Sequence, residues 1–166
     1  MRATSQIATT ITNLVSVART ALPDLQVFDG PDVNGDDARN AMWIGVDDVN
    51  ADEITAATGS ATWASIGNHT RDERFVVYAA TASWTGDSNS AADGSTDVFR
   101  TLREQAFANV AAVETAIRND PTVAAVLGNG TTLRQVEVQI VRVTQLADGA
   151  GSAVAVQFQF VCWCRI

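Results

Sequence analysis

The stretch TDVFRTLREQAFANVAAVETAIR, residues 96–118, has the clearest helical pattern in the chain. Apolar side chains recur in it at spacings of three and four residues, which places them on one face of a helix. They are Phe99, Leu102, Ala106, Val110, Val113 and Ile117, and Val98, Phe107 and Ala111 widen the stripe. Burying a large apolar side chain contributes roughly 1.5–3 kcal/mol, which outweighs the weak stability of an isolated helix. We therefore expect this helix to lie on a β-sheet.

The sheet should come from segments on both sides of this helix. Segments rich in β-branched and aromatic residues and bounded by turn formers predict the strands. They cover residues 25–28, 41–46, 61–66, 74–84, 131–145 and 153–165. Residues 41–46 are apolar on both faces, which is typical of an internal strand. A change of alternation near Ile140 indicates a β-bulge.

A second amphipathic helix is expected over residues 4–21, where Ile7, Ile11, Leu14, Ala18 and Leu22 recur at helical spacing. The fold class that follows is α+β, in one domain over residues 1–166. It has a single mostly antiparallel sheet with two helices packed on one face, in the order α-β-β-(β)-β-α-β-β. In the last strand, alternate residues from Val154 to Cys164 should face the core, and the opposite face is mixed.

The charge balance limits the functions that the chain can have. It has 19 acidic and 11 basic residues, all the basic ones being arginine, and a net charge of −8. Such a balance argues against non-specific binding to a nucleic-acid backbone, which needs positive charge. No stretch approaches the roughly 20 apolar residues of a membrane-spanning helix. Nor does the N-terminus resemble a secretory signal.

No set of residues predicts catalysis or a cofactor. His69 is the only histidine and lies in a polar stretch, and Cys162 and Cys164 fall on the apolar face of a strand, which favours packing. Residues 32–36 (DVNGD) look like a calcium loop, but the match fails at both ends. The carboxylates of residues 47–53 could hold a divalent ion loosely, although a solvated loop is the better interpretation. We predict neither a metal nor a cofactor.

The densest cluster of mixed charge is Arg71-Asp72-Glu73-Arg74. Alternating signs at the start of a strand usually form a ladder of surface ion pairs, each contributing about 0–1 kcal/mol. The functional alternative is a network of ion pairs between subunits, in which arginines meet the carboxylates of a neighbour. The sequence leaves both interpretations open.

Several segments, in this order and spacing, resemble the small tail terminator (tail completion) proteins of long-tailed, siphovirus-like phages, especially those of actinobacteria. The resemblance covers most of the chain. The segments are ALPDLQVFDGP, MWIGVDD, WASIGNHTRDERFVV, SWTGD, AVETAIRNDP and QFQFVCWCRI.

The resemblance implies a structural virion protein without enzymatic activity. Such proteins form a ring, typically of six copies, that caps the tail tube, ends its polymerisation and meets the head-tail connector or another neck protein. The implied partners are other copies of the chain, the major tail tube protein and the connector. DNA would pass through the lumen without specific binding, and no membrane is involved. Assembly would take place in the host cytoplasm, and the mature location is the top of the virion tail.

On this interpretation, two groups of residues are candidates for contacts. Subunit contacts are expected at Arg71, Asp72, Glu73, Arg74, Trp163 and Arg165. The acidic loops 29–37 and 47–53, with Asp32, Asp36, Asp37, Asp47 and Asp48, are expected to face the lumen or a ring partner.

Three alternatives remain. Another neck or tail-tube component would share the size and composition of the chain. A small acidic enzyme would depend on a metal held by residues 47–53. A cytosolic ligand-binding domain would be a monomer with an enclosed apolar pocket.

Overall fold

A computed structural model of the chain describes residues 5–32, 40–48, 52–63, 71–86, 97–119, 132–148 and 151–166. These residues form two helices and a single six-stranded sheet. In chain order, the elements are α1 (Ile7–Ala21), β1 (Gln26–Asp29), β2 (Ala41–Ile44), β3 (Ala57–Trp63), β4 (Arg71–Thr85), α2 (Val98–Asn119), β5 (Thr132–Asp148) and β6 (Gly151–Arg165). The α+β class and the element order predicted from the sequence are confirmed.

Two long strands, β4 and β6, form the middle of the sheet. The strand order is β1-β2-β4-β6-β5, and β3 pairs with β4 beyond the end of β2. β2 and β3 therefore share one edge of β4, with β3 along residues 71–77 and β2 along residues 79–82. Among the described strands, β1 and β2 are the one parallel pair. The predicted bulge is confirmed as a register shift between Ile140 and Arg142 on β5.

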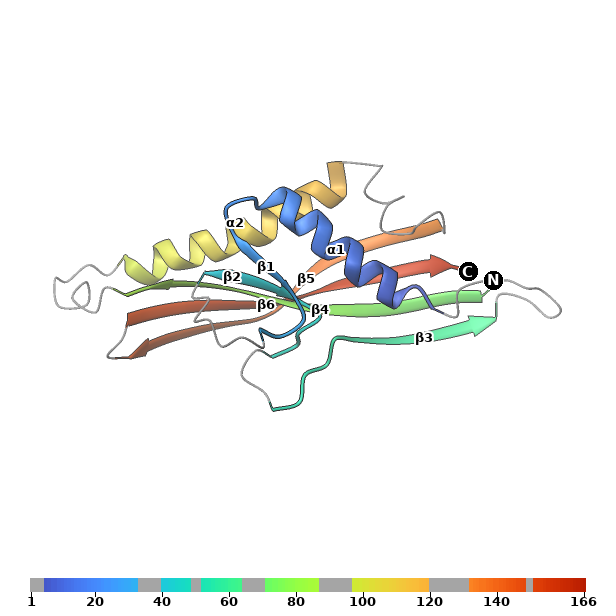
Figure 1. Cartoon of the computed structure of the whole chain (residues 1–166), viewed down its shortest axis with the longest axis horizontal. Coiled ribbons are helices and arrows are strands. Elements are labelled where there is room, and N and C mark those ends of the chain that lie inside the picture. Colours follow the sequence, from blue (N-terminus) through green and yellow to red (C-terminus); the bar gives the residue numbers. More distant parts are fainter. Residues whose placement is uncertain are drawn as a thin grey trace.

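Both helices cover the same face of the sheet (Figure 1). The buried stripe of α2 consists of Leu102, Ala106, Val110 and Val113, and α1 contributes Leu14 and Ala18. They pack on alternate residues of β4 and β6, including Phe75, Val77, Phe158 and Phe160. Cys162 and Cys164 lie in the same core and are free thiols, as their place on the apolar face predicts.

The buried stripe of α2 is narrower than the sequence indicates. Phe107 is 39% exposed and Ala111 is exposed, so the prediction that they widen the core contact is wrong. The stripe already recurs every three or four residues from Leu102 to Val113, and the next residue along a helix is turned by about 100° from it. The internal position predicted for residues 41–46 is confirmed, because every residue of β2 is buried between β1 and β4.

In the part of the chain that the structure describes, the opposite face of the sheet is covered only at the β1–β2 end. There Trp43, Val46 and Ala80 form a small cluster with the half-buried side chains of Phe28 and Ile54. Over the rest of this face, none of the described helices or strands lies on β4, β6 and β5 (Figure 1). We call this uncovered surface the open face.

Candidate functional site

The open face presents rows of side chains that run across three strands. The strand register aligns Arg74 of β4 with Trp163 of β6 and Gln135 of β5. Further along, Tyr78, Gln159 and Gln139 form another row, in which the Gln159 amide nitrogen donates to Oε1 of Gln139 over 3.0 Å. Amide and charged groups thus outnumber large apolar ones. This composition suits a hydrated surface or a protein contact with many hydrogen bonds.

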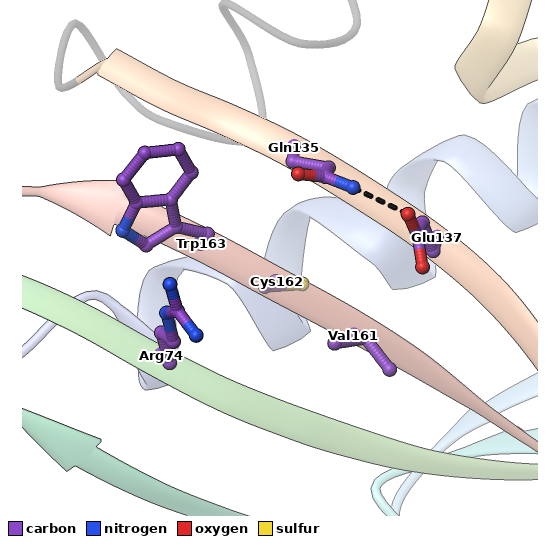
Figure 2. A pocket seen from close by; sticks show the side chains of 6 residues that line it. All are labelled: Arg74, Gln135, Glu137, Val161, Cys162 and Trp163. Atoms are coloured by element: carbon purple, nitrogen blue, oxygen red, sulfur yellow. Dashed lines mark hydrogen bonds between the residues drawn. The ribbon is translucent and has the colours of Figure 1, made fainter.

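A shallow hollow of about 220 Å³ lies on the open face (Figure 2). Its lining residues are Arg74, Gln135, Glu137, Val161, Cys162 and Trp163. The Arg74 guanidinium carbon stands 5.7 Å from the centre of the Trp163 ring, and the Gln135 amide donates to the Glu137 carboxylate. Pockets for small molecules usually measure about 300–1,000 Å³. This hollow is smaller and suits a single side chain of a protein partner.

The structure brings together most of the charged residues predicted from the sequence. Asp72 and Arg165 form a bidentate ion pair across β4 and β6, with Nε–Oδ1 at 2.7 Å and Nη2–Oδ2 at 3.0 Å. The hydrogen bonds and the charge of Asp72 raise the pKa of the Arg165 guanidinium above its ordinary value. Arg74 and Trp163 lie on the same face, one row along. Their role in a subunit contact stays a prediction.

Glu73 lies on the other side of the sheet from Asp72 and Arg74. Its side chain is only 4% exposed, and its Oε2 accepts the backbone N–H of Gln6 at the start of α1 over 2.8 Å. The Cys164 thiol lies 3.6 Å from the same oxygen. A carboxylate at this end of a helix is stabilised by the helix dipole. Glu73 therefore anchors α1 to β4 and is not presented to a neighbouring subunit.

Replacing Glu73 with alanine should destabilise the fold by roughly 1–3 kcal/mol, since the buried N–H of Gln6 loses its charged acceptor. Glu73→Gln should cost less, because the amide oxygen can still accept. Urea titration with circular dichroism measures both free energies of unfolding. The matched control is Glu137→Ala on the exposed side of β5, which should change the stability by less than about 0.5 kcal/mol. Equal losses for Glu73→Ala and the control would contradict the anchoring role.

One of the predicted acidic loops is held by its own carboxylate. Oδ1 of Asp47 accepts the backbone N–H groups of Asp48 at 2.9 Å and Thr55 at 2.8 Å. Burial raises the pKa of the Asp47 carboxyl, but these hydrogen bonds outweigh it and leave the pKa below its ordinary value. This carboxylate closes the loop. Asp32 and Asp48 are half-buried, while Asp36, Asp37 and His69 lie outside the described residues.

The described residues contain no ready metal site and no membrane helix. Within that part of the chain, no group of three His, Cys, Asp or Glu side chains is placed to hold a metal ion. Of the described helices, neither combines the length and the hydrophobicity that a membrane span needs.

The long strand predicted over residues 131–145 is confirmed as β5, but its place at the edge of the sheet was not predicted. Among the described strands it pairs only with β6, so one of its edges faces outward along 17 residues. Its exposed apolar side chains are Ile140 (45% exposed), Val141 (56%), Val143 (40%) and Leu146 (57%). The parity change at Ile140 was visible in the sequence, but it does not show that β5 is an edge strand. We call this outward side of the strand the β5 edge.

β1 and β3 lie at the opposite side of the sheet from β5, and hydrogen bonds from Arg19 cover part of the edge of β1. Arg19 of α1 donates from Nε and Nη2 to the Val27 carbonyl of β1, at 3.2 and 3.0 Å. β3 pairs only with β4 among the described strands, and its residues from Thr58 onward are exposed. Trp63 at its end is 71% exposed.

A scan against protein-family models finds no match to this chain, and a search of curated proteins finds no similar sequence.

Proposed function

We propose that the chain is a structural protein of a phage tail. It would assemble into a ring of about six copies, cap the tail tube as a terminator and meet the head-tail connector. The β5 edge is the observation that supports assembly into a ring. The resemblance of the sequence to tail terminator proteins supplies the place in the virion.

The β5 edge needs a partner. An edge strand offers a row of unpaired backbone donors and acceptors, and soluble proteins usually protect long edges with charges, bulges or a covering element. β5 has two register shifts, between Leu133 and Gln135 and between Ile140 and Arg142, yet it carries large apolar side chains that are 40–57% exposed on both sides of the second one. An exposed apolar surface rimmed by polar residues is typical of a protein interaction site. Contact with another copy would cover this edge.

The distribution of charge is compatible with a ring around DNA. Residues 24–53 contain nine acidic residues and a single arginine, so this segment alone accounts for a net charge of −8, equal to that of the whole chain. An acidic surface facing the lumen would not bind the phosphate backbone and would let DNA pass. Another neck or tail-tube component remains the alternative of the same class, because it would use the same surfaces.

The two alternatives of other classes gain less support from the described residues. A metal-dependent enzyme would need the carboxylates of residues 47–53, and Asp47 is occupied with hydrogen bonds inside its own loop. A small-ligand domain would need an enclosed apolar pocket. The hollow at Arg74 and Trp163 is open, small and partly polar.

The proposal predicts rings of about six copies with a central hole, seen by native mass spectrometry and negative-stain imaging. Added to polymerising tail tube protein of the same phage, the chain should stop elongation at the end that it binds. Leu146→Asp should abolish both activities, because it places a charge in the apolar part of the β5 edge. Phe107→Asp is the matched control on the exposed side of α2 and should retain both. Unchanged tube growth in the presence of excess chain would rule out the terminator role.

A further inference from the structure

We infer that the hollow on the open face binds a carboxylate, namely an aspartate or glutamate side chain of a partner protein, and that Arg74 holds it. The hollow is lined by Arg74, Gln135, Glu137, Val161, Cys162 and Trp163 (Figure 2). The inference goes beyond the proposed function, because it names the chemistry of a partner and requires neither a ring nor a tail tube.

The guanidinium of Arg74 has no carboxylate partner among the described residues. Its side chain is exposed, and its guanidinium carbon lies 5.7 Å from the centre of the Trp163 ring. Other arginines differ, since Arg100 and Arg118 on α2 and Arg165 on β6 each form an ion pair with a nearby acidic side chain. In a chain with 19 acidic and 11 basic residues, an exposed arginine without such a pair is available to an anion from outside.

The two carboxylates nearest to Arg74 on the open face are already engaged. Both oxygens of Asp72 accept hydrogen bonds from Arg165. Glu137 lies at the other end of the hollow from Arg74 and accepts the amide of Gln135 (Figure 2). The register places Glu137 two strands and two residues away from Arg74, roughly 12 Å between Cα atoms at the usual spacings. The Debye length is only about 8 Å at physiological ionic strength, so Glu137 repels a carboxylate bound at Arg74 weakly.

Contact with Trp163 prepares Arg74 for a carboxylate. A cation–π contact attracts the guanidinium through its charge and leaves it donors for the two parallel hydrogen bonds that a carboxylate accepts. Because the ring already restricts the Arg74 side chain, less conformational freedom is lost when a ligand binds. Val161, two residues along β6 from Trp163, adds an apolar surface for the methylene groups of the ligand. The volume of about 220 Å³ suits one such side chain.

The charge of the open face suits an acidic partner. Its described charged side chains are Arg74, Arg142, Arg165, Asp72 and Glu137. Three arginines against two carboxylates give this face a slight positive charge, although the net charge of the whole chain is −8. An acidic protein surface is therefore attracted to this face in preference to the rest of the chain. Phosphate groups are usually recognised by clusters of arginines, and the described lining of the hollow has a single one, which favours a carboxylate.

A titration with a blocked glutamate tests the site directly by nuclear magnetic resonance. N-acetylglutamate methylamide, added to the isotope-labelled chain, should shift the signals of the Arg74 Nε–H and the Trp163 indole N–H. The shifts should saturate with a dissociation constant of roughly 1–10 mM, as expected for a ligand of this size. The glutamine analogue has the same shape without the charge and should bind roughly tenfold more weakly or worse. Spectra of Arg74→Gln and Trp163→Phe identify the two signals among those of the arginines and the four tryptophans.

Substitutions of Arg74 should change the affinity for the blocked glutamate in a graded way. Arg74→Gln should weaken binding by roughly tenfold or more, because the charge and the paired donors are both lost. Arg74→Lys keeps the charge but loses the planar fork, so it should weaken binding less. Arg142→Gln is the matched control, since Arg142 is an exposed arginine of the same face outside the hollow, and it should bind like the unmodified chain. Thermal unfolding confirms that each variant is folded.

Three results would overturn the inference. The first is equal binding of the glutamine analogue, or undiminished binding by Arg74→Gln. The second is an equal loss in Arg142→Gln, which would mean general attraction by the face. The third is inorganic phosphate that shifts the same signals at a lower concentration than the blocked glutamate, which would mean a general anion site. No tail tube protein is present in these titrations, so their failure leaves the terminator role standing, and failure of tube capping leaves the carboxylate site standing.

Discussion

Raising the pH from 9 to 11 should lower the free energy of unfolding by roughly 5 kcal/mol, because two thiols ionise only when the chain unfolds. Cys162 and Cys164 lie in the core beneath the helices. Burial, together with the charge of Cys164, raises the pKa of Cys162 from 9.0 to about 12. Burial and the neighbouring Glu73 carboxylate raise the pKa of Cys164 to about 12 as well.

The sign follows from the number of protons that each state binds. Below about pH 8 both thiols are protonated in the folded and unfolded chains, so they contribute no pH dependence. Between pH 9 and 12 the folded chain keeps protons that the unfolded chain releases, and stability therefore falls as the pH rises. Each thiol contributes up to about 1.4 kcal/mol per pH unit over this interval.

The composition makes this measurement unusually direct. The chain has no lysine, so the group that dominates alkaline titration in most proteins is absent, and arginine stays protonated in this range. The chain also has only one tyrosine, Tyr78. Urea titrations at several pH values give the slope. Cys162→Ala with Cys164→Ala should flatten most of it, and an equally steep decline in that variant would contradict the assignment to the thiols.

The fold was largely predictable because its signals are local. The helical spacing of apolar residues in α2 and the alternation of apolar and polar residues in β6 can be recognised within each segment alone. Burial of one face of each element follows from these patterns. The position of Glu73 was predictable for the same reason. Glu73 is separated from Phe75 and Val77 by even numbers of residues, so it points to the same face of β4 as they do. In the sequence, residues 71–74 look like one charged cluster, although neighbouring residues of a strand point to opposite faces.

The candidate site was less predictable because it depends on strand order. Asp72 and Arg165 are 93 residues apart and meet only because β4 pairs with β6. Nothing local marks β5 as an edge strand, or directs Arg19 to the edge of β1. Exposed apolar residues such as Val141 read as core positions in the sequence, because a β-branched strand predicts burial until its neighbours are known. Surfaces for assembly can therefore be identified only when the order of the strands in the sheet is known.

The aromatic centre of the core gives the second large expected effect. Phe158 of β6 is almost fully buried and meets Phe160 edge to face, with ring centres 5.3 Å apart. Its neighbour across the sheet on β4 is Ala79. A residue as small as alanine cannot fill the space that a lost phenyl ring would leave, and the rigid strands on both sides limit collapse.

Phe158→Ala should therefore destabilise the chain by about 3–5 kcal/mol, the range found when buried aromatic residues are truncated. A domain of this size has only about 5–15 kcal/mol of stability, so the variant should unfold at a much lower urea concentration. Phe107→Ala removes the same ring from the exposed side of α2 and should cost less than about 1 kcal/mol. Comparable losses at both positions would contradict the exposed position of Phe107 on α2.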